Sequence, residues 1–146
     1  IHTILDTSGY APWDILSQIS QNVDLFLYDI KHMDDEKHRE ITGQSNKLII
    51  ENLKKLTAMG KTIWIRVPII PSINDEEENL IRIIDMMKLL GLRDIFLLPY
   101  HNIAVDKYGK LNMKYNIPEI QAPSDEHMKE ISQKFKSYGL NVRIGG

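Results

Sequence analysis

Cysteine is absent from this chain of 146 residues, which excludes disulfide bonds and thiolate metal sites on the chain itself. Glycine and proline are also scarce, at 8 and 6 residues. No apolar run approaches the roughly 18 residues that a membrane-spanning helix needs. With 42% hydrophobic and 26% charged residues, the composition is that of a globular domain rather than of a collagen-like or disordered chain.

The chain also has no large excess of positive or negative charge. The net charge is −2 and the isoelectric point is about 6.2, so no basic field favours nucleic acid or a membrane as a partner. An initiator methionine is missing too, since the chain opens at Ile1 inside an apolar run, without a charged segment or cleavage site. We therefore expect a single domain over residues 1–146 that is the C-terminal part of a longer protein.

Short apolar runs alternate with amphipathic stretches along the chain. Strands are predicted at residues 2–6, 25–31, 62–70, 94–99 and 141–144. Helices are predicted at residues 12–19, 46–59, 74–90 and 124–138. Apolar strands separated by helices are typical of a mostly parallel sheet, so the predicted fold class is α/β with about five strands and flanking helices. Periodicity alone leaves open whether the sheet is part of a barrel or an open sheet.

Three local signals refine these boundaries. Asn74 is the predicted N-cap of the third helix, because Glu77 lies three residues later and the acidic run suits the positive end of a helix dipole. Pro68 and Pro71 are predicted to mark the end of the third strand. The segment from about residue 102 to 122 is too long for an ordinary connection, which indicates a functional lid.

Polar residues stand at the ends of four predicted strands: Asp6 and Thr7, Asp29 and Lys31, Arg66, and His101. The carboxyl ends of parallel strands share one edge of a sheet, so we expect these side chains around one rim, with Asp29 and Lys31 on the same face. Carboxylates suit an amine and ribose hydroxyls, and cations suit a carboxylate, so the set favours a zwitterionic ligand. Each residue also has an ordinary reading as a turn, loop or ion-pair residue.

Five short motifs occur in a particular order and spacing: Asp6–Gly9, Tyr28–Met33, Trp64–Pro68, Pro71–Asp75 and Leu97–His101. Together they resemble the glycyl-radical-enzyme activating enzymes, a radical S-adenosylmethionine (AdoMet) family typified by pyruvate formate-lyase activating enzyme. The resemblance covers residues 4–144 and implies the C-terminal part of a partial (β/α)6 TIM-like barrel. Two mild departures are Ser8, where the family usually has Asn, and Ile30, where it usually has Leu.

The resemblance implies a function and a set of partners. Members bind a 4Fe–4S cluster through a CxxxCxxC loop and cleave AdoMet to a 5′-deoxyadenosyl radical, which takes hydrogen from a glycine of a partner enzyme. A flavodoxin or ferredoxin-type protein would donate the electron, in the cytoplasm, with no nucleic acid or membrane involved. The predicted AdoMet-binding residues are Asp6, Thr7, Asp29, Lys31, Arg66 and His101. The predicted ligands of a monovalent cation are Asp6, Thr7, Asp29 and the backbone carbonyl of Leu27.

The main departure from the family is what this chain lacks. It has neither the CxxxCxxC loop nor a glycine-rich segment for the AdoMet amino group, so it holds no cluster ligands and no catalytic residue of its own. We therefore expect the chain alone to be inactive and to carry neither cofactor. We also expect an exposed strand edge, which favours self-association.

Two other functions remain open from the residues. In a Schiff-base aldolase, Lys31 would be the nucleophile, with Asp29 or His101 handling protons. A lysine beside two aspartates keeps its proton, which counts against that role. In a non-catalytic α/β binding module, the lysine- and tyrosine-containing segment Asn102–Tyr115 would contact a protein partner.

Overall fold

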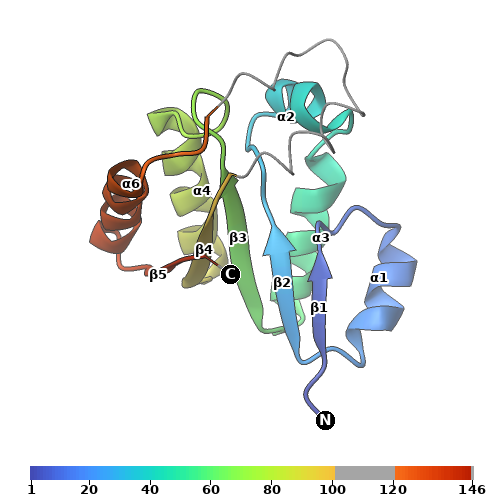
Figure 1. Ribbon diagram of the computed structural model, residues 1–146. Coiled ribbons are helices and arrows are strands. Elements are labelled where there is room, and N and C mark those ends of the chain that lie inside the picture. The colour runs from blue at the N-terminus through green and yellow to red at the C-terminus, as the bar shows by residue number, and fades with distance from the viewer. Residues whose placement is uncertain (101–120, 146) are drawn as a thin grey trace.

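The computed structural model describes residues 1–100 and 121–145 of the chain (Figure 1). The strands described are β1 (Ile4–Thr7), β2 (Leu25–Asp29), β3 (Ile63–Ile69), β4 (Asp94–Pro99) and β5 (Asn141–Ile144). The helices described are α1 (Trp13–Ser20), α2 (Asp35–Thr42), α3 (Lys47–Ala58), α4 (Glu77–Leu90) and α6 (Asp125–Ser137). The strands form one parallel sheet in the order β1-β2-β3-β4-β5. The predicted α/β class is confirmed.

The order of the strands places the helices on one face of the sheet. Each strand pairs with the strand before it, so right-handed crossovers all turn to the same side. Along β3 the side chains alternate: Ile65 and Val67 are fully buried towards the helices, whereas Trp64 and Arg66 are half-buried on the other face. Parallel strands in sequential order with helices outside are the wall of a (β/α) barrel, as predicted.

The core lies between the sheet and the helices. It is built from fully buried side chains of the strands, among them Phe26, Tyr28, Ile65, Val67, Ile95 and Leu97. On the helix side, α3 contributes Leu53 and Leu56, and α4 contributes Ile83 and Ile84. None of the helices in residues 1–100 and 121–145 has both the length and the apolar character needed to cross a bilayer.

Helix α2 is absent from the sequence-based prediction. Only His38 and Ile41 of its eight residues are buried, so it has no apolar stripe that periodicity could detect. Its ends do carry ordinary capping signals. The Asp34 carboxylate accepts a hydrogen bond from the Lys37 backbone N–H at 3.0 Å, and Gly43 ends the helix with φ +79°. The cap at Ser124 of α6 is confirmed, because its hydroxyl accepts from the His127 N–H at 3.1 Å.

Of the two predicted boundaries after β3, the helix cap is wrong and the end of the strand is confirmed to within one residue. Asn74 does not cap α4, whose N-cap is Glu76; Asn74 is fully buried, and its side-chain oxygen accepts from the Ile70 N–H at 2.8 Å. β3 ends at Ile69, which lies between Pro68 and Pro71 and is one residue short of the predicted end at residue 70. Since β2 stops at Asp29, β4 is the only strand within residues 1–100 and 121–145 that pairs beside Pro68. A proline is tolerated there because no second ladder in that part of the chain needs its N–H.

Candidate functional site

Three of the predicted site residues meet at the carboxyl ends of β1, β2 and β3. Asp6, Asp29 and Arg66 all lie on the sheet face opposite the helices, and Asp29 pairs with Arg66 in the strand register. The Arg66 Nε donates a hydrogen bond to Asp29 Oδ1 at 2.8 Å. The Arg66 Nη2 donates to Asp6 Oδ1. One guanidinium therefore joins two carboxylates from two different strands, and the expected shared rim is confirmed for these three residues.

The three side chains of this Asp6–Arg66–Asp29 cluster differ in their exposure to water. The side chain of Arg66 is 17% exposed, that of Asp29 is 25% exposed and that of Asp6 is 60% exposed. Burial alone lowers the pKa of Arg66, but its hydrogen bonds and charge attraction to Asp29 and Asp6 outweigh that effect and raise this pKa above its usual value. The arginine stays charged, so two carboxylates and one guanidinium carry one net negative charge.

The loop after β1 is held in place by contacts with side chains of β2 and α3. The Thr7 hydroxyl accepts a hydrogen bond from the Gly9 N–H at 2.9 Å, on the helix-facing side of the sheet. Gly9 has φ +73° and packs directly on the Tyr28 ring. The buried amide of Asn52 donates to the Gly9 carbonyl at 2.7 Å and to the Ala11 carbonyl at 2.9 Å. These contacts fix the chain beside Asp6.

The loop after β2 is held by buried asparagines. The strand ends at Asp29 and not at residue 31, so Lys31 lies in the loop, half-buried, with its carbonyl accepting from the Asn74 amide at 3.0 Å. The Asn46 amide donates to the Met33 carbonyl at 2.9 Å. The Asn79 side-chain oxygen accepts from the Met33 N–H at 2.9 Å. The sequence did not reveal that these asparagines support the loop. In the sequence, each one is only an asparagine within a turn-like motif.

His32 closes the same loop against the start of α4. Its side chain is 2% exposed, and its Nδ1 accepts a hydrogen bond from the Asp34 N–H at 3.0 Å. The neutral ring therefore carries its proton on Nε2, which lies 3.1 Å from Glu76 Oε1. Glu76 also accepts from Lys37 Nζ at 2.6 Å. Burial, the largest influence, lowers the pKa of His32 below its ordinary value, although Glu76 acts in the opposite direction.

His32 is expected to make the protein less stable in mild acid. With its pKa lowered on folding, the unfolded chain binds the proton more readily, so this contribution is full above pH ~6.5 and is lost as the pH falls towards the lowered pKa. Urea unfolding at pH 7.5 and pH 5.5 measures the loss. His32→Gln, which keeps a hydrogen-bonding side chain, should reduce it, whereas the exposed-site control His2→Gln should not. Equal pH dependence in all three proteins would contradict this assignment.

The remaining predicted residues are placed less directly. Leu27 pairs with Asp6 in the strand register, which puts its backbone next to the cluster. His101 and the segment 102–120 lie outside the described residues, so the predicted lid and the predicted adenosine contact stay predictions. Among the residues that the structure does describe, no group of three or more His, Cys, Asp or Glu side chains is arranged to hold a metal ion.

Comparison with other proteins identifies the family. No family model matches the chain. It is 43% identical to the trans-4-hydroxy-L-proline dehydratase activating enzyme of Clostridioides difficile, over 100% of this chain and 49% of that protein. It is 35% identical to the choline trimethylamine-lyase activating enzyme of Oleidesulfovibrio alaskensis, over 99% of this chain and 48% of that protein. The chain thus spans about half the length of the curated relatives it matches.

A solved structure covers the same region. The crystal structure of a domain of pyruvate-formate lyase-activating enzyme from Bacteroides vulgatus superposes with a TM-score of 0.81 at 30% identity. The match covers 100% of this chain and 82% of that one. The chain belongs to the glycyl-radical-enzyme activating enzymes. The family resemblance of the five motifs is therefore confirmed, and the fold is the one that resemblance implies.

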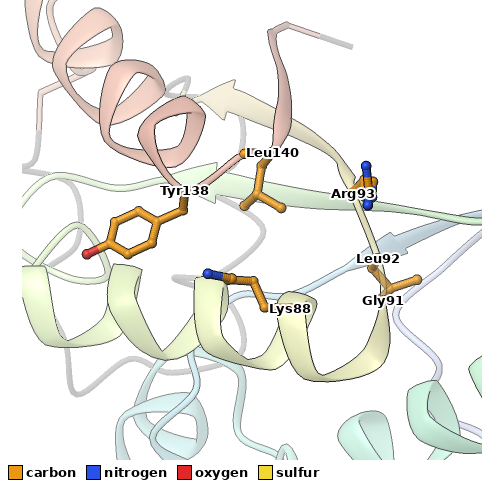
Figure 2. A pocket seen from close by; sticks show the side chains of 7 residues that line it. Lys88, Gly91, Leu92, Arg93, Tyr138 and Leu140 are labelled. Atoms are coloured by element: carbon orange, nitrogen blue, oxygen red, sulfur yellow. The ribbon is translucent and has the colours of Figure 1, made fainter.

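This activating-enzyme chain also has a cavity at the other end of its sheet. A hollow of about 310 Å³ lies beside the amino ends of β4 and β5, where Figure 2 shows Tyr138, Lys88 and Leu140 around it. The Lys88 Nζ lies 5.6 Å from the Tyr138 ring centre. The carboxyl ends of α4 and α6 adjoin this cavity. The positive charge of Lys88 offsets the negative ends of their helix dipoles. Ligands of parallel α/β sheets bind at the opposite end, so we assign no ligand here.

Proposed function

We propose that this chain forms the carboxyl-terminal part of a barrel that binds AdoMet and activates a glycyl radical enzyme of the pyruvate formate-lyase type. The single observation that supports it best is the Asp6–Arg66–Asp29 cluster at the carboxyl ends of adjacent strands. The relatives named above support the reaction class, but their partner enzymes differ, so the individual partner is not specified. The chain without cluster ligands is inactive on its own.

The charged side chains of the site suit the proposed ligand. AdoMet carries an ammonium and a carboxylate, and when bound to a 4Fe–4S cluster it supplies the radical chemistry. The net negative Asp6–Arg66–Asp29 cluster would attract the ammonium, and Lys31 would attract the carboxylate. The buried asparagines around Lys31 hold its backbone in place before any ligand arrives. His101 would contact the adenosine.

Further partners follow from the same proposal. A flavodoxin or ferredoxin-type protein would donate the electron, and the protein would work in the cytoplasm. In the described part of the chain β1 pairs only with β2, so its outer edge has no strand partner. Such an edge accepts another strand readily, and we propose that the isolated chain self-associates through it.

The proposed activity has a direct test in the complete protein. After anaerobic reconstitution with iron and sulfide, we expect AdoMet and a reductant to produce a glycyl radical on a glycyl radical enzyme from the same source, detected by electron paramagnetic resonance. Residues 1–146 treated in the same way should show no iron–sulfur absorbance, because they contain no thiol. No radical on any such enzyme, despite a full cluster and AdoMet cleavage, would contradict the proposed function.

A further inference from the structure

Two buried histidines hold α2, the helix that lies beyond the carboxyl end of β2 (Figure 1). His32 lies in the loop before the helix and is 2% exposed, and His38 lies within the helix and is 3% exposed. Of the eight residues in α2, only His38 and Ile41 are buried. A helix with so few buried side chains opens at a low cost in free energy, so the contacts of the two histidines matter for keeping it docked.

His32 holds the start of α2 through a ring nitrogen that must be unprotonated. Its Nδ1 accepts a hydrogen bond from the N–H of Asp34, the N-cap of the helix, at 3.0 Å. A proton on Nδ1 would leave two N–H groups facing each other, so the ring or the start of the helix would have to move. Burial lowers the pKa of His32 and outweighs the opposite effect of Glu76 and Asp34, while Lys37 also lowers this pKa.

His38 holds the end of α2 in the opposite tautomer. Its Nδ1 lies 2.7 Å from the Gln44 carbonyl, which can only accept, so the neutral ring carries its proton on Nδ1. A second proton on Nε2 would charge a buried ring near the Lys31 ammonium. Burial lowers the pKa of His38, and Lys31 lowers it further. The hydrogen bond to Gln44 and the charge of Asp35 only partly oppose them.

Protons therefore favour a state in which α2 is released. Exposed histidine rings have the ordinary pKa of about 6.5 and docked rings have a lower one, so the released state binds protons more readily. The docked state is fully favoured above pH ~6.5 and loses ground as the pH falls towards the lowered pKa values. Between pH 7.5 and pH 5.5, each ring shifts the equilibrium by up to about 10-fold towards release.

Two ion pairs also join the start of α2 to α4. They connect Lys37 with Glu76 at 2.6 Å and Asp34 with Arg82 at 3.9 Å. All four side chains are more than a third exposed, so water screens both pairs and each contributes little. These pairs do not hold the helix once the histidines are charged.

We propose that His32 and His38 form a pH-sensitive switch: in mild acid, protons on the two rings release α2 and residues 32–34 while the sheet and α3 stay folded. The switch depends only on the contacts of the two rings. One consequence rests on the proposed function: Lys31 directly precedes the released segment, so mild acid should weaken the binding of AdoMet.

Hydrogen–deuterium exchange of the complete protein at pH 7.5 and pH 5.5 tests this switch. Rates are converted to protection factors, which removes the intrinsic pH dependence of exchange. We expect protection of residues 35–42 to fall by up to about 100-fold in acid, and by no less than about 10-fold. Release of α2 alone exposes little surface, so this protection should hardly change in about 1 M urea. Protection of α3, residues 47–58, should be higher and should fall with urea.

Variants of the two histidines separate the switch from other effects of acid. His32→Asn and His38→Asn keep an amide near the position of Nδ1 but carry no charge. Each should reduce the pH effect on α2 by up to about 10-fold, and the double variant should abolish it. The exposed-site control His2→Gln should retain the full effect.

The comparison of α2 with α3 needs no variant, so it decides the matter even where a variant does not fold. Equal protection and equal urea dependence of the two helices, or an α2 that is unchanged in mild acid, would overturn the switch. The exchange is measured without AdoMet. Release of α2 in a protein that forms no glycyl radical would therefore support the switch and count against the activating function, and a glycyl radical with a pH-insensitive α2 would do the reverse.

Discussion

Replacing Gly9 by alanine is expected to lower the free energy of unfolding by about 2–4 kcal/mol. Gly9 has φ +73°, where an alanine costs about 1 kcal/mol, and crowding a packed interior costs about 1–3 kcal/mol more. The added Cβ would lie 1.7 Å from the Tyr28 hydroxyl oxygen, so the ring or the loop must move. Moving the ring also strains the hydrogen bond from the Tyr28 hydroxyl to the Ile49 carbonyl, which measures 2.5 Å.

Gly43 provides a matched control for this substitution. It has φ +79°, and nothing lies within 4 Å of an added Cβ, so Gly43→Ala should cost only the backbone term. Urea unfolding of the two variants at one pH gives the difference, which we expect to be about 1–3 kcal/mol. Equal destabilisation by the two substitutions would show that the contact between Gly9 and Tyr28 does not fix the loop after β1.

The sequence predicts most of the fold because its strands and longer helices carry strong apolar patterns. The five strands bury alternate or continuous apolar residues, and α3, α4 and α6 each have an apolar stripe, so periodicity finds them. Helix α2 is not predicted because few of its side chains are buried. Its capping signals, Asp34 and Gly43, are single residues. The end of β2 is predicted less well, at residue 31 instead of Asp29, since the extent of a strand depends on which neighbour it can pair with.

The candidate site is predictable in part for a related reason. Parallel strands must bring their carboxyl ends to one edge, so Asp6, Asp29 and Arg66 could be expected together. That one guanidinium would join both acids could not be expected, because it depends on the strand register. The supporting asparagines could not be predicted, because the backbone groups to which their buried amides hydrogen-bond lie far away in the sequence. Lys31 and Asn74, which are 43 positions apart in the sequence, illustrate the point.

The affinity of the complete, reconstituted protein for AdoMet tests the central claim, which is that the carboxyl ends of these strands form the AdoMet site. We expect Asp29→Ala to weaken AdoMet binding by about 30-fold or more, since losing one partner of a shielded charge pair costs about 2 kcal/mol or more. Asp94 lies on the same sheet, at the amino end of β4, so Asp94→Ala is the matched control.

Isothermal titration of AdoMet into the unaltered protein, Asp29→Ala and Asp94→Ala gives all three affinities in one experiment. The melting temperature of each variant without ligand shows that each one is folded. The site described here predicts an affinity loss in Asp29→Ala alone. Unchanged affinity in a folded Asp29→Ala, or an equal loss in Asp94→Ala, would contradict it.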